Sequence, residues 1–167
     1  DVLEAQWKAR FDLASDVDDT DGDFCGAHIV RNADGTVELT CDRLYNELAL
    51  RLTPYPLPHG FTCTYPMSAN TSSLFRAEVT DANPRMPAGL QSIARGIVGL
   101  GGFIVCNMRP DAHFSFVSLT QFLAHGFTKH VWYGVLRWAY YLMATRNLRL
   151  TFRFSSSPVW AMSSDSA

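Results

Sequence analysis

The sequence predicts an α+β protein in which a small β-hairpin region with flanking helices precedes a bundle of helices. Near the N-terminus, short stretches of alternating apolar and polar residues flank an Asp-Gly pair, a pattern typical of a β-hairpin. From residue 87 onward, apolar residues recur at helical spacing over long segments. The chain has 167 residues, of which 47% are hydrophobic, and this is enough for one domain with a buried core.

Residues 1–52 are expected to form a helix, a β-hairpin and a second helix. Apolar residues at helical spacing predict the two helices, and the alternation around the Asp-Gly turn predicts the hairpin. The expected elements are a helix over 2–13 with Leu3, Trp7 and Phe11 on one face, strands over 24–30 and 36–40 joined by a turn at 32–35, and a helix over 41–52 with Thr40 or Asp42 as its N-cap.

Residues 53–86 are expected to form a Pro-rich connecting loop, because their prolines prevent a continuous helix. Residues 87–147 are expected to be a helical region, and glycines in its first helix are expected to allow close approach by another backbone. Residues 148–167 are expected to begin a strand region. The expected elements are helices over 87–106, 110–124 and 128–146, a left-handed cap at Asn147, a strand over 148–152 with Arg149 and Arg153 on one face, and a further short strand in the tail.

The acidic stretch DVDDTDGDF, residues 16–24, raises the question of a metal site. No register fits a calcium loop, because with Gly22 at the sixth position His28 would stand where a glutamate is needed. A polymerase-type pair at Asp18 and Asp19 would need apolar flanking strands, and here the flanks are polar. We therefore interpret the stretch as a solvated loop.

Other chemical motifs are missing from the sequence. The four cysteines have no CxxC spacing, and the five histidines include no HExxH. We therefore expect no metal site or cofactor in the chain. The longest apolar run, Gly96–Cys106, is shorter than the ~20 residues of a membrane helix, so we expect no transmembrane span. The N-terminus does not resemble a signal peptide, so we expect an intracellular protein, in the cytoplasm, the nucleus or an organelle.

The net charge of −2 conceals an asymmetry between the two halves of the chain. Residues 1–83 contain 6 basic and 14 acidic residues, and residues 84–167 contain 8 basic and 2 acidic residues. Either the basic half faces a polyanion or the two halves attract each other.

A collinear series of short motifs resembles the copia-type LTR-retrotransposon reverse transcriptase. The family has a helix with the pattern Y-R-S-x-V-G-x-L-x-Y-L, then T-R-P-D, then a Thr-x-x-His-W helix leading into V-L-R-Y-L. The counterparts of these patterns here are Ser92–Gly99, Arg109-Pro110-Asp111, Lys129–Trp132 and Val135–Trp138. Further segments that match the family lie at Trp7–Phe11, Phe24–Ile29, Gln121-Phe122 and Thr145–Phe152. Leu90-Gln91 departs from the pattern, because the family has Tyr before Arg-Ser.

The resemblance implies an RNA-directed DNA polymerase that needs Mg²⁺, but this chain would hold neither complete active site. In the family the catalytic aspartate pair lies upstream of the Trp7 helix, so Asp18 and Asp19 are not that pair. Asp165 would match the first metal carboxylate of the ribonuclease H domain. The chain would correspond to the end of the palm (1–52), the loop (53–86), the thumb and connection (87–147) and the start of ribonuclease H (148–167).

The resemblance further implies that these parts hold a primer–template duplex through its phosphates. The expected carriers of that contact, near Trp132 and Trp138, are Lys129, Arg137, Arg146, Arg149 and Arg153. Arg109 is expected to be a structural clasp that bonds Asp111 or a helix end. The alternative is a domesticated structural subunit, packed against other protein subunits in a larger assembly that could be membrane-bound.

Overall fold

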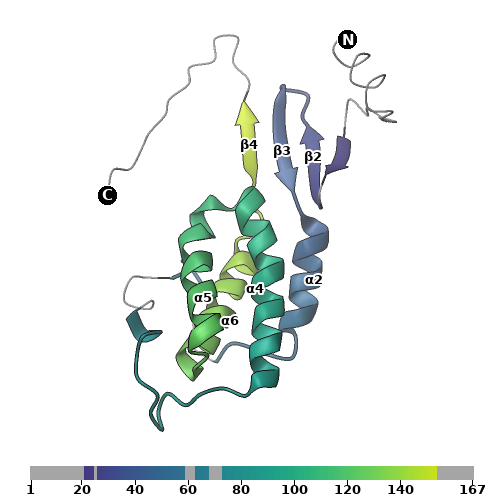
Figure 1. Cartoon of the computed structure of the whole chain (residues 1–167). Helices are drawn as coiled ribbons and strands as arrows, with labels where there is room; N and C mark the ends of the chain where they lie inside the picture. The colour runs from purple at the N-terminus through teal and green to yellow at the C-terminus, as the bar shows by residue number, and fades with distance from the viewer. Residues whose placement is uncertain (1–20, 25, 59–62, 68–72, 154–167) are drawn as a thin grey trace, which may run out of the picture.

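The computed structural model describes residues 21–24, 26–58, 63–67 and 73–153, which form an α+β fold (Figure 1). The predicted fold class is confirmed. A four-stranded antiparallel sheet, in the order β1-β2-β3-β4, stands at one end of the helices. The elements are β1 (Asp21–Phe24), β2 (Ala27–Arg31), β3 (Thr36–Thr40), α2 (Asp42–Leu52), α4 (Ala88–Met108), the short 3-10 helix η1 (Pro110–Ala112), α5 (His113–His125), α6 (Lys129–Ala144) and β4 (Leu150–Arg153).

The predicted hairpin is confirmed, and β2 and β3 are joined by its turn. Gly35 donates its N–H to the Asn32 carbonyl and has a φ of 81°, a conformation that favours glycine. Asp34 Oδ1 accepts hydrogen bonds from the Thr36 N–H and hydroxyl, at 2.9 and 2.7 Å. The turn is therefore fixed by the side chains that made Asn-Ala-Asp-Gly a hairpin signal.

The interpretation of residues 16–24 as a loop is wrong for its second half. Residues 21–24 form β1, which pairs with β2 from Asp21↔Val30 to Phe24↔Ala27. This strand lies at the edge of the sheet, where short, charged strands are common because they discourage further pairing. The first half of the stretch, the helix expected over 2–13, Asp165 and the tail strand all lie outside the described residues.

The N-terminus of α2 differs from the prediction. Cys41 is its N-cap residue, and no side chain makes the capping hydrogen bond, so neither Thr40 nor Asp42 is the cap. Asp42 lies in the first turn, where its charge is favourable beside the positive end of the helix. The apolar spacing of Leu44, Leu48 and Leu52 gives α2 an inward face, on which Leu48 and Leu52 are buried and Leu44 is partly buried.

The core lies between α2, α4, α5 and α6. The predicted helix from residue 87 is confirmed and extends to Met108. The expectation that its glycines admit a backbone is wrong for Gly101 and Gly102, because aromatic rings lie there. A Cβ on Gly101 would meet the Trp138 ring at 2.7 Å, and one on Gly102 would meet Phe116.

The connection from α2 to α4 is fastened to the start of α6. Asn83 is buried, and its side-chain oxygen accepts the His130 N–H at 3.1 Å. The Pro84 carbonyl accepts the Lys129 N–H. Two of the free N–H groups at the first turn of α6 are thereby satisfied by the preceding loop.

Strand β4 joins the N-terminal sheet, since it pairs with β3 from Thr36↔Arg153 to Leu39↔Leu150. The second strand of the expected C-terminal pair falls on the tail, outside the described residues, and β4 itself pairs with a segment far away in the sequence. The helix before it is shorter than predicted, because α6 ends at Ala144 and Thr145 is its C-cap residue.

Helix α4 is, within the described residues, the one helix long and apolar enough to cross a membrane. Of its most apolar 18-residue stretch, 39% is buried against the rest of the molecule. A core helix of a soluble domain has the same properties, so the expectation that the chain has no transmembrane span stays a prediction.

Candidate nucleic-acid interface

A buried arginine fixes the junction between the helices and the sheet. Arg109, the residue after α4, is only 2% exposed. Its Nε and Nη2 donate to the two carboxylate oxygens of Asp111, at 2.9 and 2.8 Å. This bidentate geometry matches the guanidinium fork to a carboxylate, and such a pair is among the stronger hydrogen-bonded contacts in proteins.

The same guanidinium holds the C-terminal end of α6 and one side of α2. Its Nη1 and Nη2 donate to the carbonyl and the hydroxyl of Thr145, at 3.0 and 2.8 Å. Its Nη1 also donates to the Tyr45 hydroxyl at 3.3 Å, and Tyr141 donates its hydroxyl to Asp111 at 2.6 Å. We call this group of five residues the Arg109 clasp. The predicted clasp is confirmed, and it includes both expected partners, Asp111 and a helix end.

The electrostatics of the clasp keep both charges in place. Hydrogen bonds from Arg109 hold the pKa of the Asp111 carboxyl below its ordinary value. Burial opposes the charge on Arg109, but the hydrogen bonds with Asp111 and Tyr45 outweigh it and raise the Arg109 pKa. Burial raises the pKa of the Tyr45 hydroxyl, which therefore stays neutral. The Arg109 and Asp111 charges are therefore both present near neutral pH, and their hydrogen bonds tie α2, the end of α4 and the end of α6 together.

Three of the predicted phosphate-binding residues follow the clasp closely in the chain. Arg146 comes directly after Thr145, Arg149 precedes β4, and Arg153 ends β4. All three are exposed. They lie along the segment that leads from α6 into the sheet, and the clasp fixes the start of that segment.

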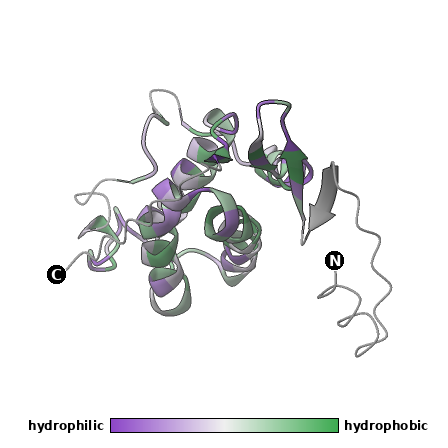
Figure 2. Ribbon diagram, turned by 90° about the horizontal axis from the view of Figure 1, so that it is seen from above, coloured by the Kyte–Doolittle hydropathy of each residue, from purple (hydrophilic) through white to green (hydrophobic). Residues whose placement is uncertain are grey.

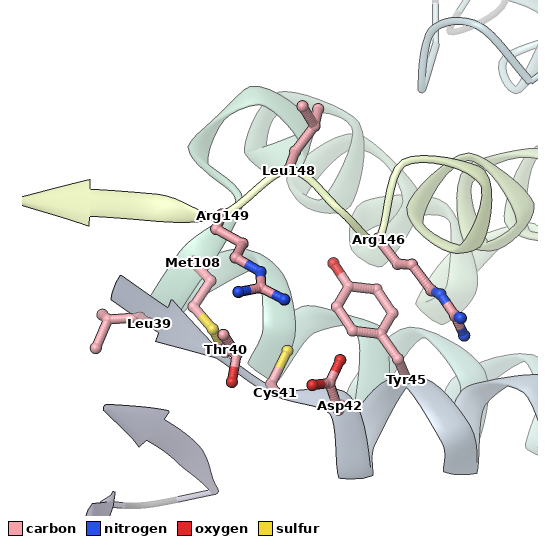
Figure 3. Close-up of a pocket in the computed structure, with 9 residues that line it drawn as sticks. All are labelled: Leu39, Thr40, Cys41, Asp42, Tyr45, Met108, Arg146, Leu148 and Arg149. Carbon is pink, nitrogen blue, oxygen red and sulfur yellow. The ribbon is translucent and has the colours of Figure 1, made fainter. Parts of the chain in front are cut away.

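Arg146 and Arg149 line a small pocket between this segment and α2 (Figure 3). The head of Arg149 points into the pocket, and that of Arg146 points away from it. The cavity has a volume of about 10 Å³, which is room for about one water molecule. Its other lining residues are Leu39, Thr40, Cys41, Asp42, Tyr45, Met108 and Leu148. The pocket is too small for a nucleotide, so any contact with a large anion takes place on the surface around it.

The pocket combines positive and negative groups. The N-terminus of α2, with no side-chain cap, contributes the positive end of a helix dipole, and Asp42 opposes it. Burial raises the pKa of the Cys41 thiol to about 12, so this thiol is protonated. Arg149 pairs with Glu38 at 3.0 Å. Outside the pocket, hydrogen bonds from Thr36 lower the pKa of the Asp34 carboxyl, and the nearby charge of Arg153 lowers it further.

Lys129 and Arg137 lie away from these three arginines. Lys129 begins α6, so it is about 25 Å along the helix axis from Arg146. Arg137 is half-buried, with its guanidinium 4.6 Å from the centre of the Tyr65 ring. Its Nε is buried and has no hydrogen-bond partner among the described residues. The structure therefore brings Arg146, Arg149 and Arg153 into one segment and leaves the other two apart.

The two tryptophans expected near the basic residues belong to the core. Trp138 is fully buried and donates its indole N–H to the Ala112 carbonyl at 3.4 Å. Trp132 is buried against Tyr55 and Phe127. Neither ring is accessible for stacking on a base, so contacts near these residues would be to phosphate.

Within the described part of the chain, no three His, Cys, Asp or Glu side chains are grouped to hold a metal ion. The described residues therefore offer no set of ligands for the Mg²⁺ that the resemblance implies for the intact family. Asp165 lies outside the described residues. Comparisons with protein-family models, curated proteins and solved structures gave no match. The resemblance to copia-type reverse transcriptases therefore depends on the sequence motifs alone.

Proposed function

We propose that this chain is a non-catalytic part of a copia-type reverse transcriptase that binds a primer–template duplex through its phosphates. The observation that carries the proposal is the exposed basic segment Arg146–Arg153, which begins at a rigid clasp. The collinear motifs support it, since they include Arg109-Pro110-Asp111 and the helix that leads into this segment. The chemistry of polymerisation would belong to aspartates upstream, and no residue here is assigned a catalytic role.

The physical basis is attraction to a regularly charged rod. A nucleic-acid duplex offers phosphates along its length, and a fixed arginine binds them without reading the bases. The Arg109 clasp reduces the motion of the segment that carries Arg146, so less conformational entropy is lost on binding. Because Arg149 is paired with Glu38, it should contribute less to phosphate binding than Arg146 and Arg153 do.

The test is binding of the full chain to a fluorescently labelled RNA–DNA duplex at low and moderate salt. The double variant Arg146→Ala/Arg153→Ala should bind more weakly. The matched control is Arg76→Ala/Arg85→Ala, which removes the same charge from exposed positions outside the basic segment. Equal losses of duplex affinity in the two double variants would mean that binding depends only on the net charge of the chain. Absence of binding at low salt would refute the proposal.

A second candidate function is packing inside a larger protein assembly, and a specific observation favours it. Large apolar side chains are exposed on several elements, and Leu50 and Phe114 are 74% and 64% exposed. Such residues often mark contact surfaces with other proteins. Sedimentation of the isolated chain, with a dye that binds apolar surface, separates the two candidates. A stable monomer with little dye binding would count against the packing role.

A further inference from the structure

The outward side of helix α5 is uncharged and partly apolar. The helix, His113–His125, contains no Asp, Glu, Lys or Arg. After His113, its exposed residues are Phe114 at 64%, Val117 at 39%, Thr120, Gln121 and Ala124. A surface helix normally carries charged residues on the side that faces water. An uncharged outward side with large apolar residues is instead typical of a contact surface for another molecule.

The rest of the described chain leaves this side of α5 open. The other side of α5 packs against α4 and α6. Figure 1 shows α5 and α2 at opposite sides of the helical bundle, and Figure 2 shows the sheet to one side of the helices. Residues 73–76, in the connection from α2 to α4, border the open side, and Leu74 in this segment is 48% exposed. Exposed apolar side chains thus lie both on α5 and on the segment that borders it.

A hollow of about 320 Å³ lies between α5 and residues 73–76. Phe75 fixes its shape, since this residue is only 3% exposed and its ring centre lies 5.6 Å from that of Phe122. The Phe75 ring occupies the space that Gly134 leaves, where a Cβ would overlap it. The buried ring holds both sides of the hollow together, so the hollow is formed before any partner binds. Its lining includes apolar Phe114, Val117 and Phe122 and polar Arg76, Ser118 and Gln121.

The size of the hollow suits the side chains of a protein segment. A volume of about 320 Å³ is at the low end of the range for ligand pockets. Leu74 is exposed but does not line the hollow. A small molecule in the hollow would therefore leave Leu74 in water, whereas a protein segment lying along α5 would cover it as well. The wider apolar surface thus favours a protein partner.

Charge indicates which kind of segment fits. Arg76 is the one charged residue among those that line the hollow. Its side chain is in no ion pair within the described part of the chain. A carboxylate would give this guanidinium a partner, whereas a basic segment would be repelled. A second copy of the chain, docked symmetrically through the same surface, would bring two Arg76 side chains to one interface, and their repulsion disfavours it.

The outward residues around the hollow, which we call the α5 face, are Leu74, Arg76, Phe114, Val117, Ser118 and Gln121. We propose that the α5 face docks an acidic segment of a partner protein. An apolar side chain of that segment enters the hollow beside Phe114 and Phe122, and a carboxylate binds the planar guanidinium of Arg76. This inference rests on the second candidate function, packing with other proteins, and is independent of nucleic-acid binding.

Selection from a library of random peptides displayed on phage tests the proposal, with the full chain immobilised as bait. The enriched peptides should combine a large apolar residue with Asp or Glu. A synthetic copy of the most enriched peptide should bind Phe114→Ser at least about tenfold more weakly than the wild type. Arg76→Glu should weaken binding to a similar extent, because two like charges would then meet. Both positions are exposed, so both variants should fold, and circular dichroism checks this.

The matched controls are Leu50→Ser and Arg43→Glu, which make the same kinds of change at exposed positions of α2. Both controls should bind the peptide as the wild type does. Absence of enriched peptides, enrichment of basic peptides, or equal losses in variants and controls would overturn the proposal. A loss in Leu50→Ser alone would overturn this site but leave the packing role in place through α2. A dimer in sedimentation that Phe114→Ser dissociates would overturn the proposal in favour of a second copy.

Discussion

Replacing Arg109 should be among the most destabilising single changes in this protein. In Arg109→Met, the Asp111 carboxylate loses two donors, and the Thr145 carbonyl and hydroxyl lose one each. Asp111 is 40% exposed, so water partly replaces the lost contacts, and we assign about 1 kcal/mol to each lost bond. The expected loss is about 3–4 kcal/mol in the free energy of unfolding, since the arginine of the pair is buried and holds several partners.

Urea denaturation followed by circular dichroism would measure this loss. Arg109→Lys keeps the charge but not the planar fork, and about half of the loss is expected. The control Arg43→Met removes an exposed arginine from α2 and should change stability by less than about 0.5 kcal/mol. If Arg109→Met is as stable as the control, the clasp does not hold the helices together, and the rigidity argued for the basic segment is lost.

Three further predictions concern packing, capping and pH. Gly101→Ala should cost about 1–3 kcal/mol because its methyl would overlap the buried ring of Trp138, whereas Gly99→Ala has open space and should gain about 0.5–1 kcal/mol; thermal unfolding compares them. Asn83→Ala should lose about 1–2 kcal/mol with its capping bond, measured by urea denaturation, and an unchanged midpoint would contradict the capping role. The pKa of Asp111 is lowered in the folded state, so its stabilisation is present above the unfolded-state pKa and is lost as the pH falls through the folded-state value. Asp111→Asn should therefore show a smaller loss of stability on acidification, and an identical pH profile would refute this.

The sequence predicted the helices and the hairpin well because their signals are local. The apolar spacing of α2, α4 and α6 and the Asp-Gly turn needed no knowledge of distant residues. Strand β1 was missed because Asp21–Phe24 has no apolar alternation and is a strand only through pairing with β2. The pairing of β4 with β3 joins segments over 100 residues apart, and periodicity carries no information about such a contact.

The site was predicted in part. Arg109 was expected as a clasp from its position beside Asp111, but Tyr45 and Tyr141 joined it only through folding. The five basic residues were taken as one group, although the rise of a helix already separates Lys129 from Arg146. The Trp138 ring is buried against Gly101 of α4, and this contact forms only when α4 and α6 pack together.

The salt dependence of duplex binding tests the central claim most directly. Each phosphate neutralised by an arginine contributes about 0.9 to the slope of log K against log salt concentration. We predict measurable binding of the full chain at low salt, and a slope that falls by about 1.8 in Arg146→Ala/Arg153→Ala but stays nearly constant in Arg76→Ala/Arg85→Ala. A slope that is the same in the wild type and in the first variant, or no binding at all, would contradict a phosphate-binding role for this segment.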